Sequence, residues 1–266
     1  MKLVRFSEDQ TFSRDRTARF GILKNGSVQD IIGTPFSNFR LGDILYSLDQ
    51  VKLEAPVTPS KVVAVGLNYR DHADELKMSP PEEPLLFLKP STSVIGPEES
   101  IIYPGSSQRI DYEAELAVVI RSVTKDVEAE EATEHILGFT CANDVTARDL
   151  QKKDGQWTRS KSFDTFSPLG PWIETELEPG NLKIELLLNG EIRQSSNTSK
   201  MIFPIESLVS FVSKMMTLLP GDIILTGTPP GVGPMRVGDM VEARIEGIGS
   251  LKNDVRYRFG FEDRRE

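Results

Sequence analysis

The sequence has few of the residues that build cysteine or histidine sites. Cys141 is its only cysteine, and His72 and His135 are its only histidines in 266 residues. No intrachain disulfide can form, and a zinc site made of Cys and His ligands cannot be assembled. Any bound metal must therefore be held mainly by oxygen.

Long apolar and basic segments are also missing. No apolar run approaches the roughly 18 residues of a membrane span, and the opening stretch MKLVRFSEDQ lacks the apolar centre of a signal peptide. The net charge is −9 and there is no long Lys/Arg run, which argues against nucleic acid or an anionic membrane as the main partner. We expect a cytoplasmic protein with no nucleic-acid or membrane partner.

Several common catalytic motifs are absent. The sequence has no G-x-S-x-G elbow, no G-x-x-x-x-G-K-[ST] phosphate loop and no G-x-G-x-x-G after a strand. The glycine-rich stretch GTPPGVGP lacks the lysine that phosphate loops use. These absences argue against serine hydrolases and nucleotide-binding enzymes, and no repeat at a fixed period is visible.

The chain divides into two predicted domains, residues 1–57 and 58–266. The first contains a short strand at LVRF, a hairpin turning at Asn25-Gly26, and a brief helix-like piece, LGDILYSL. The segment LEAPVTPSK, with Pro56 and Pro59, is typical of a linker. The sequence therefore predicts a small β-rich N-terminal domain before a larger one.

Strand patterns dominate the larger domain, and one long helix is predicted. Apolar segments such as KVVAVG, ELAVVI and LKIELLLNG are separated by Gly/Pro turns and do not alternate with helices. In FPIESLVSFVSKMMTLLPGD, Pro204 suits the first helical position and Pro220-Gly221 a stop. The apolar stripe expected to face the core is Ile205, Leu208, Val209, Val212, Met215, Met216 and Leu219. A β-rich α+β fold, twisted and mostly antiparallel, is the prediction.

The strand around Glu113 and Glu115 poses a charge problem. Alternation places both glutamates on one face, roughly 6 to 7 Å apart, with Asp111 behind them. Two carboxylates at that distance repel by about 2 to 3 kcal/mol at an effective dielectric near 20. Either this face is wet, or a cation lies there.

Other polar clusters follow apolar strands. His72 and Glu75 are three residues apart, so on a helix the carboxylate can orient the imidazole as a general base, although such pairs are more often surface contacts. His135 is interpreted as such a surface residue. The remaining candidates lie at strand ends or in rigid loops and are Lys89, Asp144, Arg148, Gln151, Lys161 and Thr228. Taken singly, Lys89 is more typical of a solvated side chain, and Asp144 of a turn or helix cap, than of a site.

Together and in order, six motifs resemble the fumarylacetoacetate hydrolase superfamily over residues 60–255. They are GLNYRDHADE, LLFLKP, DYEAELAVVI, NDVTARDLQ, KSFDTFSPLGP and TGTPPGVG. The resemblance implies a twisted mixed β-sandwich or roll, and one Mg²⁺ or Mn²⁺ held by Glu113, Glu115 and Asp144, ligands that suit hard cations. Asp111 is then a solvated or hydrogen-bonded neighbour.

The resemblance also implies the chemistry. Three carboxylates and a divalent cation leave about −1, which Lys89, Arg148 and Lys161 offset, so a small anionic 2-oxo acid suits the site. Family members cleave acylpyruvates, decarboxylate oxaloacetate-like acids or isomerise double bonds through a metal-stabilised enolate. The expected enzyme belongs to the acylpyruvase, oxaloacetate decarboxylase and 2-hydroxyhepta-2,4-diene-1,7-dioate isomerase-like branch. The alternatives are that isomerase specifically, or a non-catalytic member that only binds metal and 2-oxo acid.

By analogy with the family, each matched residue receives a role. His72 and Glu75 activate water or relay a proton, and Lys161 steadies negative charge. Substrate carboxylates are expected to contact Lys89, Arg148, Gln151 and Thr228. Residues 68–84 are predicted to form a lid. The two-part layout resembles homodimeric members, with the N-terminal unit either at the subunit interface or covering a sheet edge.

Overall fold

The computed structural model describes residues 1–8 and 18–258. Both predicted domain ranges therefore include residues outside those described, 9–17 and 259–266. The N-terminal strands are β1 (Lys2–Glu8), β2 (Arg19–Lys24), β3 (Ser27–Ile32), β4 (Arg40–Ser47) and β5 (Val51–Leu53).

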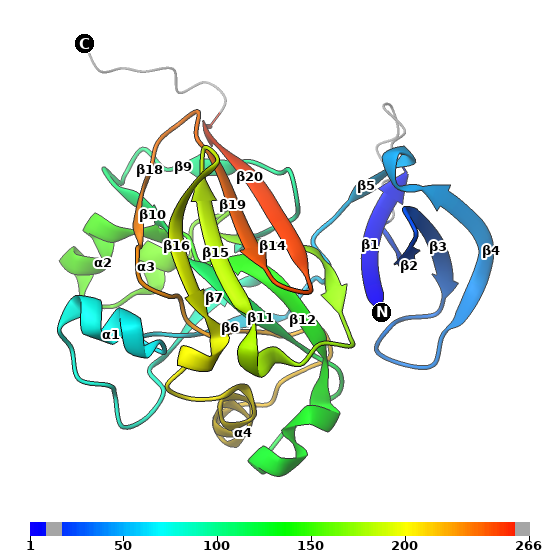
Figure 1. The fold of residues 1–266 in the computed structure, drawn as a ribbon, viewed down its shortest axis with the longest axis horizontal. Helices are drawn as coiled ribbons and strands as arrows, with labels where there is room; N and C mark the ends of the chain where they lie inside the picture. Colours follow the sequence, from blue (N-terminus) through cyan, green and yellow to red (C-terminus); the bar gives the residue numbers. More distant parts are fainter. Residues whose placement is uncertain (9–17, 259–266) are drawn as a thin grey trace.

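The larger body contains the other strands and the helices (Figure 1). Its strands are β6 (Lys61–Val65), β7 (Leu86–Pro90), β8 (Val94–Ile95), β9 (Ile101–Tyr103), β10 (Ile110–Tyr112), β11 (Ala114–Ile120), β12 (Ile136–Asn143), β13 (Thr146–Ala147), β14 (Ser167–Glu174), β15 (Lys183–Leu188), β16 (Glu191–Asn197), β17 (Ile223–Leu225), β18 (Gly233–Met235), β19 (Met240–Ile245) and β20 (Gly249–Tyr257). Its α-helices are α1 (Arg70–Leu76), α2 (Arg148–Asp154), α3 (Thr158–Lys161) and α4 (Ile205–Met215).

These strands form three sheets in the part of the chain that the structure describes. A 12-stranded sheet has the path β4-β3-β2-β1-β14-β12-β11-β17-β6-β7, with β5 paired to β1 and β8 paired to β14 off this path. A five-stranded sheet has the order β16-β15-β19-β20-β9, and β13-β10-β18 form a small third sheet. Most pairs are antiparallel, but β17 with β6, β14 with β8 and β20 with β9 are parallel. The predicted β-rich, mixed-sheet fold is confirmed.

The N-terminal unit corrects one prediction. Its hairpin turns at Asn25 and Gly26, whose φ angles of 51° and 76° are the positive values that such a turn needs. The segment LGDILYSL, however, is not helical: β4 pairs along β3, with Val28 opposite Tyr46, and only a short 3-10 turn, Leu48–Gln50, follows. Cross-strand hydrogen bonding to β3 outweighs the local helical spacing.

The N-terminal unit continues the large sheet. Strand β1 pairs with β14, with Lys2 opposite Glu174, and the amino group of Met1 lies 2.6 Å from Oε1 of Glu174. Figure 1 shows the unit at one side of the larger body, joined through this edge. The N-terminal strands thus cover an edge of the sheet, one of the two arrangements expected.

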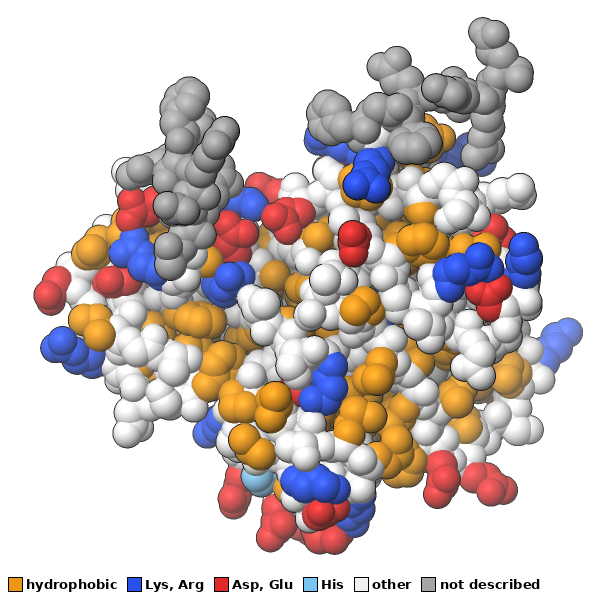
Figure 2. Space-filling model, turned by 180° about the vertical axis from the view of Figure 1, so that it is seen from behind, with side chains coloured by type: hydrophobic (Ala, Val, Ile, Leu, Met, Phe, Trp, Pro, Cys, Tyr) orange, Lys and Arg blue, Asp and Glu red, His pale blue; other side chains and the backbone are white. Residues whose placement is uncertain are grey.

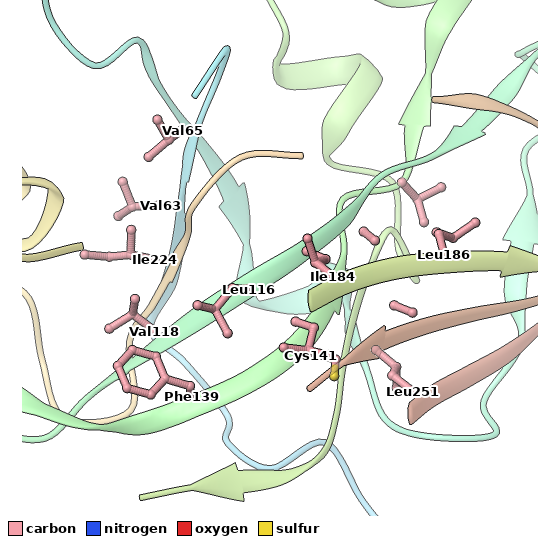
Figure 3. Close-up of a cluster of buried hydrophobic side chains, with 14 of the residues drawn as sticks. Val63, Val65, Leu116, Val118, Phe139, Cys141, Ile184, Leu186, Ile224 and Leu251 are labelled. Carbon is pink, nitrogen blue, oxygen red and sulfur yellow. The ribbon is translucent and has the colours of Figure 1, made fainter. Parts of the chain in front are cut away.

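The main core lies between the large sheet and the five-stranded sheet. In Figure 3, Leu116 and Val118 of β11 face the same cluster as Ile184 and Leu186 of β15, and Leu251 of β20 closes it. Every residue of β11 is buried, which explains its nearly unbroken apolar sequence after Glu115. A strand buried on both faces is a rigid support for side chains at its beginning.

Helix α4 is shorter than predicted. Pro204 is its N-cap and not its first helical residue, and the helix ends at Met215, five residues before Pro220. Beyond it the chain is extended, because Leu218 pairs with Thr124 in a β-bridge. Met215 and Leu219 are consequently 54% and 41% exposed, so placing these two in the core was wrong.

The described surface carries mixed charges. On the face in Figure 2, basic and acidic side chains are interspersed, with acidic ones gathered along the lower edge. None of the helices in residues 1–8 and 18–258 has the length and apolar character of a membrane span.

Candidate active site

Three acidic side chains meet where two central strands end. Glu113 lies in the break between β10 and β11, Glu115 is on β11, and Asp144 follows β12. Ala114 pairs with Asn143, and the Asp144 N–H donates to the Glu113 carbonyl at 2.8 Å, so the strand register brings the carboxylates together. One oxygen from each lies within 4.8 Å of the other two, and all three side chains are buried.

Two of these carboxylates are paired with buried cations. The Lys161 ammonium donates to Oε2 of Glu113 at 2.7 Å and also to Asp144, and Lys89 donates to Asp144 from the other side. Arg148 donates to Oε1 of Glu113. Burial alone raises the pKa of Glu113, but Lys161 and Arg148 outweigh it and bring this pKa down to about 2.

Glu115 differs from the other two carboxylates in its partners. In the described residues it has no ion-pair partner, and its Oε2 accepts one hydrogen bond, 2.7 Å long, from the Gly227 N–H. Burial raises the pKa of Glu115 well above its usual value, and the charges of Asp144 and Glu113 add to the shift. A divalent cation beside these three oxygens would relieve this repulsion.

Asp111 is buried and hydrogen-bonded, so the alternative that it is solvated was wrong. Arg109 Nε donates to its Oδ1 at 2.8 Å, and Arg148 Nε donates to its Oδ2 at 2.9 Å. Asp111 thereby holds Arg148 in place against Glu113. Both oxygens of Asp111 already accept from guanidinium groups, so this residue orients the Arg148 side chain and is not placed to bind a metal.

Helix α1 presents the predicted His/Glu pair. Nδ1 of His72 lies 2.9 Å from Oε2 of Glu75, and the Gly231 N–H donates to Oε1 of Glu75 at 3.1 Å. The helix is therefore tied to the loop after β17. His135 lies elsewhere, with its Nδ1 near the hydroxyls of Ser122 and Thr124.

A cavity of about 240 Å³ joins most of these groups. Its polar wall contains the predicted residues His72, Glu113, Glu115, Asp144, Arg148, Gln151, Lys161 and Thr228. Glu75 supports His72 from outside this wall, with its side chain 44% exposed. Predicted residues from five of the six motifs thus share one cavity.

Lys89 does not reach the cavity wall. Its side chain is fully buried, and besides Asp144 it donates to the Phe166 carbonyl at 2.7 Å. The structure therefore gives it no contact with a substrate in the cavity and places it behind Asp144. The sequence pattern, an apolar strand that ends in lysine, is the same for a lysine at the cavity wall and for one buried behind Asp144.

The Thr228 hydroxyl is also less free than expected. It donates to the Ala114 carbonyl at 2.9 Å and accepts from Nε2 of Gln194 at 2.9 Å. A hydroxyl carries a single hydrogen, so in this arrangement it cannot also donate to a substrate carboxylate. One lone pair remains to accept a hydrogen bond.

The cavity also has an apolar lining, which was not predicted. It consists of Val65, Leu67, Leu76, Met78, Leu85, Phe87 and Trp157, with the rings of Phe87 and Trp157 packed edge to face at 5.1 Å. These residues come from four separate segments. Nothing in their local sequence marks them, because an apolar residue at a strand end is ordinarily core.

The predicted lid divides into a fixed and an exposed part. Asn68 is buried, and its amide donates to the carbonyls of Thr226 at 2.7 Å and Phe203 at 3.2 Å. Asp71 accepts from Ser196. The segment after α1 is exposed, with Met78 at 55% and Leu85 at 53%. Hydrogen bonds therefore hold the first residues of the predicted lid, and the lid itself remains a prediction.

The carboxylate cluster suits a hard divalent cation. It offers three oxygen ligands without any sulfur or nitrogen, the donor set that Mg²⁺ and Mn²⁺ favour. Glu115, which lacks a cation partner in the described residues, is the ligand that most requires one. Glu113, Glu115 and Asp144 are the residues that would hold it.

Comparison with known proteins places the chain in a family. Residues 61–256 match the fumarylacetoacetate (FAA) hydrolase C-terminal model, and residues 1–56 match the Rv2993c-like N-terminal model. The chain is 49% identical to the oxaloacetate tautomerase Fahd2a, mitochondrial, of Rattus norvegicus over 218 residues, which is 77% of this chain and 70% of the rat protein.

Solved structures of similar proteins support the same family assignment. A 5-carboxymethyl-2-hydroxymuconate delta-isomerase from Mycobacterium smegmatis superposes with a TM-score of 0.90 and 44% identity, covering 97% of this chain and 100% of that one. A maleylpyruvate hydrolase from Sphingobium sp. SYK-6, in complex with manganese (II) ion and pyruvate, has a TM-score of 0.79 and 28% identity, covering 97% and 99%. The chain belongs to the fumarylacetoacetate hydrolase family.

Proposed function

We propose that this protein is a divalent-metal-dependent enzyme that moves a proton on a small 2-oxo dicarboxylic acid, with oxaloacetate keto–enol tautomerisation as the leading reaction. The observation that carries the proposal is the buried cluster of Glu113, Glu115 and Asp144 beside His72 in one cavity. The 49% identity to a rat oxaloacetate tautomerase and the likeness to a muconate isomerase support proton transfer over bond cleavage.

Bound to the three carboxylates, the cation would supply Lewis-acid stabilisation of negative charge on the 2-oxo oxygen. The protein's own residues then have to move the proton and hold the carboxylates. Lys161 lies at the cavity wall, where its ammonium can stabilise the same charge.

His72 is the proposed proton carrier. Because Glu75 accepts at Nδ1, 2.9 Å away, the imidazole keeps its proton on that nitrogen and leaves Nε2 as the base. Nε2 can take a proton from C3 of a 2-oxo acid, or from the enol oxygen, and return it to the other position. Glu75 stabilises the imidazolium formed between the two transfers.

Arg148 and Gln151 are the proposed carboxylate contacts. Nη1 of Arg148 donates to Oε1 of Gln151 at 2.6 Å, which turns the amide nitrogen of Gln151 outward as a donor. Both residues line the cavity. Arg148 uses three of its N–H groups on Asp111, Glu113 and Gln151, and the remaining two can bind a carboxylate.

Two other functions remain as alternatives. The likeness to a maleylpyruvate hydrolase favours C–C bond hydrolysis, in which His72 and Glu75 would activate water. The same cavity lining would also suit an isomerase that acts on 2-hydroxyhepta-2,4-diene-1,7-dioate. An isomerase of that name from Mycobacterium marinum is 41% identical to this chain, with a TM-score of 0.89. A protein that binds oxalate without turning over any 2-oxo acid would be a non-catalytic member.

The test follows enol-oxaloacetate by its ultraviolet absorbance with Mg²⁺, Mn²⁺ or EDTA, and pyruvate release in parallel. We expect metal-dependent loss of the enol without matching pyruvate. Glu115→Ala should abolish this activity, while Glu130→Ala, an exposed acid, should not. Full activity in EDTA, or pyruvate formed at the same rate, would overturn the proposal.

A further inference from the structure

Gln194 is a buried polar residue that no motif singled out. It lies on β16, where Glu191, Ile192, Arg193 and Ser195 are exposed, but Gln194 itself is only 1% exposed. Its side chain leaves the five-stranded sheet and reaches the break between β10 and β11, where Glu113 lies. A glutamine buried this completely must find partners for its amide.

Its partners are Thr228 of the cavity lining and two residues next to site residues, Ala114 and Pro229. Oε1 accepts from the Ala114 N–H at 2.9 Å, and Nε2 donates to the Thr228 hydroxyl at 2.9 Å and to the Pro229 carbonyl at 2.7 Å. The oxygen faces a donor and the nitrogen faces a carbonyl, so the amide has only one orientation that satisfies both.

These bonds close a ring. Thr228 donates to the Ala114 carbonyl at 2.9 Å, so Gln194 and Thr228 bind both backbone polar groups of Ala114 and also bind each other. Ala114 is the residue between the two glutamates of the cluster. The ring therefore fixes the main chain from which Glu113 and Glu115 project.

The loop bearing Thr228 is held closely against β16. A Cβ added at Gly231 would lie 2.3 Å from the Arg193 carbonyl oxygen, which only glycine avoids. The Gly227 N–H of the same loop donates to Glu115. The packing of this loop against β16 therefore sets the position of the Gly227 N–H that donates to Glu115.

We infer that Gln194 is a positioning residue that sets the affinity of the site for its metal and 2-oxo acid through the Gln194–Thr228–Ala114 ring. This rests on the function proposed above. Because Gln194 and Ala114 fix the Thr228 hydrogen toward Ala114, the hydroxyl presents a lone pair to the cavity. It accepts from a ligand O–H, such as that of an enol, and does not donate to a carboxylate.

The test uses two variants of Gln194. Gln194→Met removes all three hydrogen bonds, and Gln194→Glu keeps the shape and the acceptor but loses the donors to Thr228 and Pro229. Ser195→Ala, an exposed change on the same strand, is the control. Calorimetry measures Mn²⁺ affinity, then oxalate affinity of the Mn²⁺-loaded protein, and kinetics give kcat and KM for enol-oxaloacetate.

We expect Gln194→Met to weaken Mn²⁺ and oxalate binding by about 10- to 100-fold, and Gln194→Glu to weaken oxalate binding and raise KM more than it lowers kcat. In a Thr228→Val background, Gln194→Met should change oxalate affinity by less than about threefold, because the ring is already broken. Ser195→Ala should match wild type.

Folded Gln194 variants with wild-type affinities, or effects that add to those of Thr228→Val, would overturn the inference. If Gln194→Met does not fold, the decision rests on Gln194→Glu. Wild-type protein that binds neither Mn²⁺ nor oxalate would overturn the proposed function itself. The two failures are therefore distinguishable.

Discussion

Lys161 and Glu113 form a buried ion pair, with Nζ 2.7 Å from Oε2 and both side chains less than a tenth exposed. The same ammonium donates to Asp144, so one lysine pairs with two of the three proposed metal ligands. Together with Lys89 and Arg148, Lys161 offsets the negative charge of the cluster in the protein without a metal.

Lys161→Met should therefore destabilise the metal-free protein by about 3 kcal/mol, because each of two buried carboxylates loses one of its two cation partners: Glu113 keeps only Arg148 and Asp144 keeps only Lys89. Mn²⁺ should restore much of this loss, since the cation replaces the missing charge, while turnover of enol-oxaloacetate should fall. Urea unfolding in EDTA and in Mn²⁺ measures both effects. Equal stability of variant and wild type in EDTA would contradict the neutralising role.

His72→Asn should reduce kcat by about 10²- to 10⁴-fold, the usual contribution of a general base. Glu75→Gln should reduce it less, because the imidazole remains but loses its charged partner. Mn²⁺ affinity should stay within about twofold, since neither side chain contacts Glu113, Glu115 or Asp144 in the ion pairs and hydrogen bonds found.

The matched control is His135→Asn, which removes the other histidine, a residue that does not line the cavity. It should leave kcat unchanged. If His72→Asn retains wild-type kcat, the proton carrier must be another group, and Lys161 becomes the first candidate.

The exposed segment 77–85 should become ordered over bound ligand. Met78 and Leu85 line the cavity yet are more than half exposed, so a ligand that brings them inward would bury apolar surface. We expect hydrogen exchange there to slow with oxalate and Mg²⁺ together. Exchange at the exposed Asn189-Gly190 turn is the internal control, and unchanged protection of 77–85 would remove the lid.

Asp222→Asn should lower stability by about 2 kcal/mol near neutral pH. The side chain is fully buried and accepts from the backbone N–H groups of Ser60 and Leu219, and it pairs with Lys61. Burial raises the pKa of Asp222, but the hydrogen bonds of Lys61 and Ser60 outweigh it and lower the pKa below its ordinary value.

The pH dependence of the stability that Asp222 contributes follows from its lowered pKa. The carboxylate stabilises the fold above its unfolded pKa of about 4, and this contribution is lost as the pH falls through the lower folded value. The difference between wild type and Asp222→Asn should thus be constant above about pH 5 and shrink below about pH 4. Urea unfolding across pH 3 to 7 measures it, and a difference that grows in acid would refute the assignment.

The acidic cluster could be predicted from sequence because its charge pattern is local. Two glutamates on one face of an otherwise apolar strand are unfavourable without a cation, and the spacing is visible in the chain. The grouping of Asp144 with them came from the resemblance, and strand pairing of Ala114 with Asn143 is what brings it there.

Placements that depend on neighbours were not predictable. Helical spacing in LGDILYSL gave way to pairing with β3, and α4 ended early because Leu218 pairs with Thr124. Lys89 and Thr228 have the same local sequence whether they face substrate or the protein. Their partners, Asp144 and Gln194, lie 55 and 34 residues away.

The sequence by itself determined the β-rich class, the expectation that any metal is held mainly by oxygen, and the residues that carry charge, because these depend on residue types and short-range periodicity. Tertiary structure decided which charged groups face the cavity, which hydroxyl is already bound, and that Gln194 holds the chain between Glu113 and Glu115. Hydrogen bonds between residues distant in sequence fix these orientations, and no local pattern encodes them.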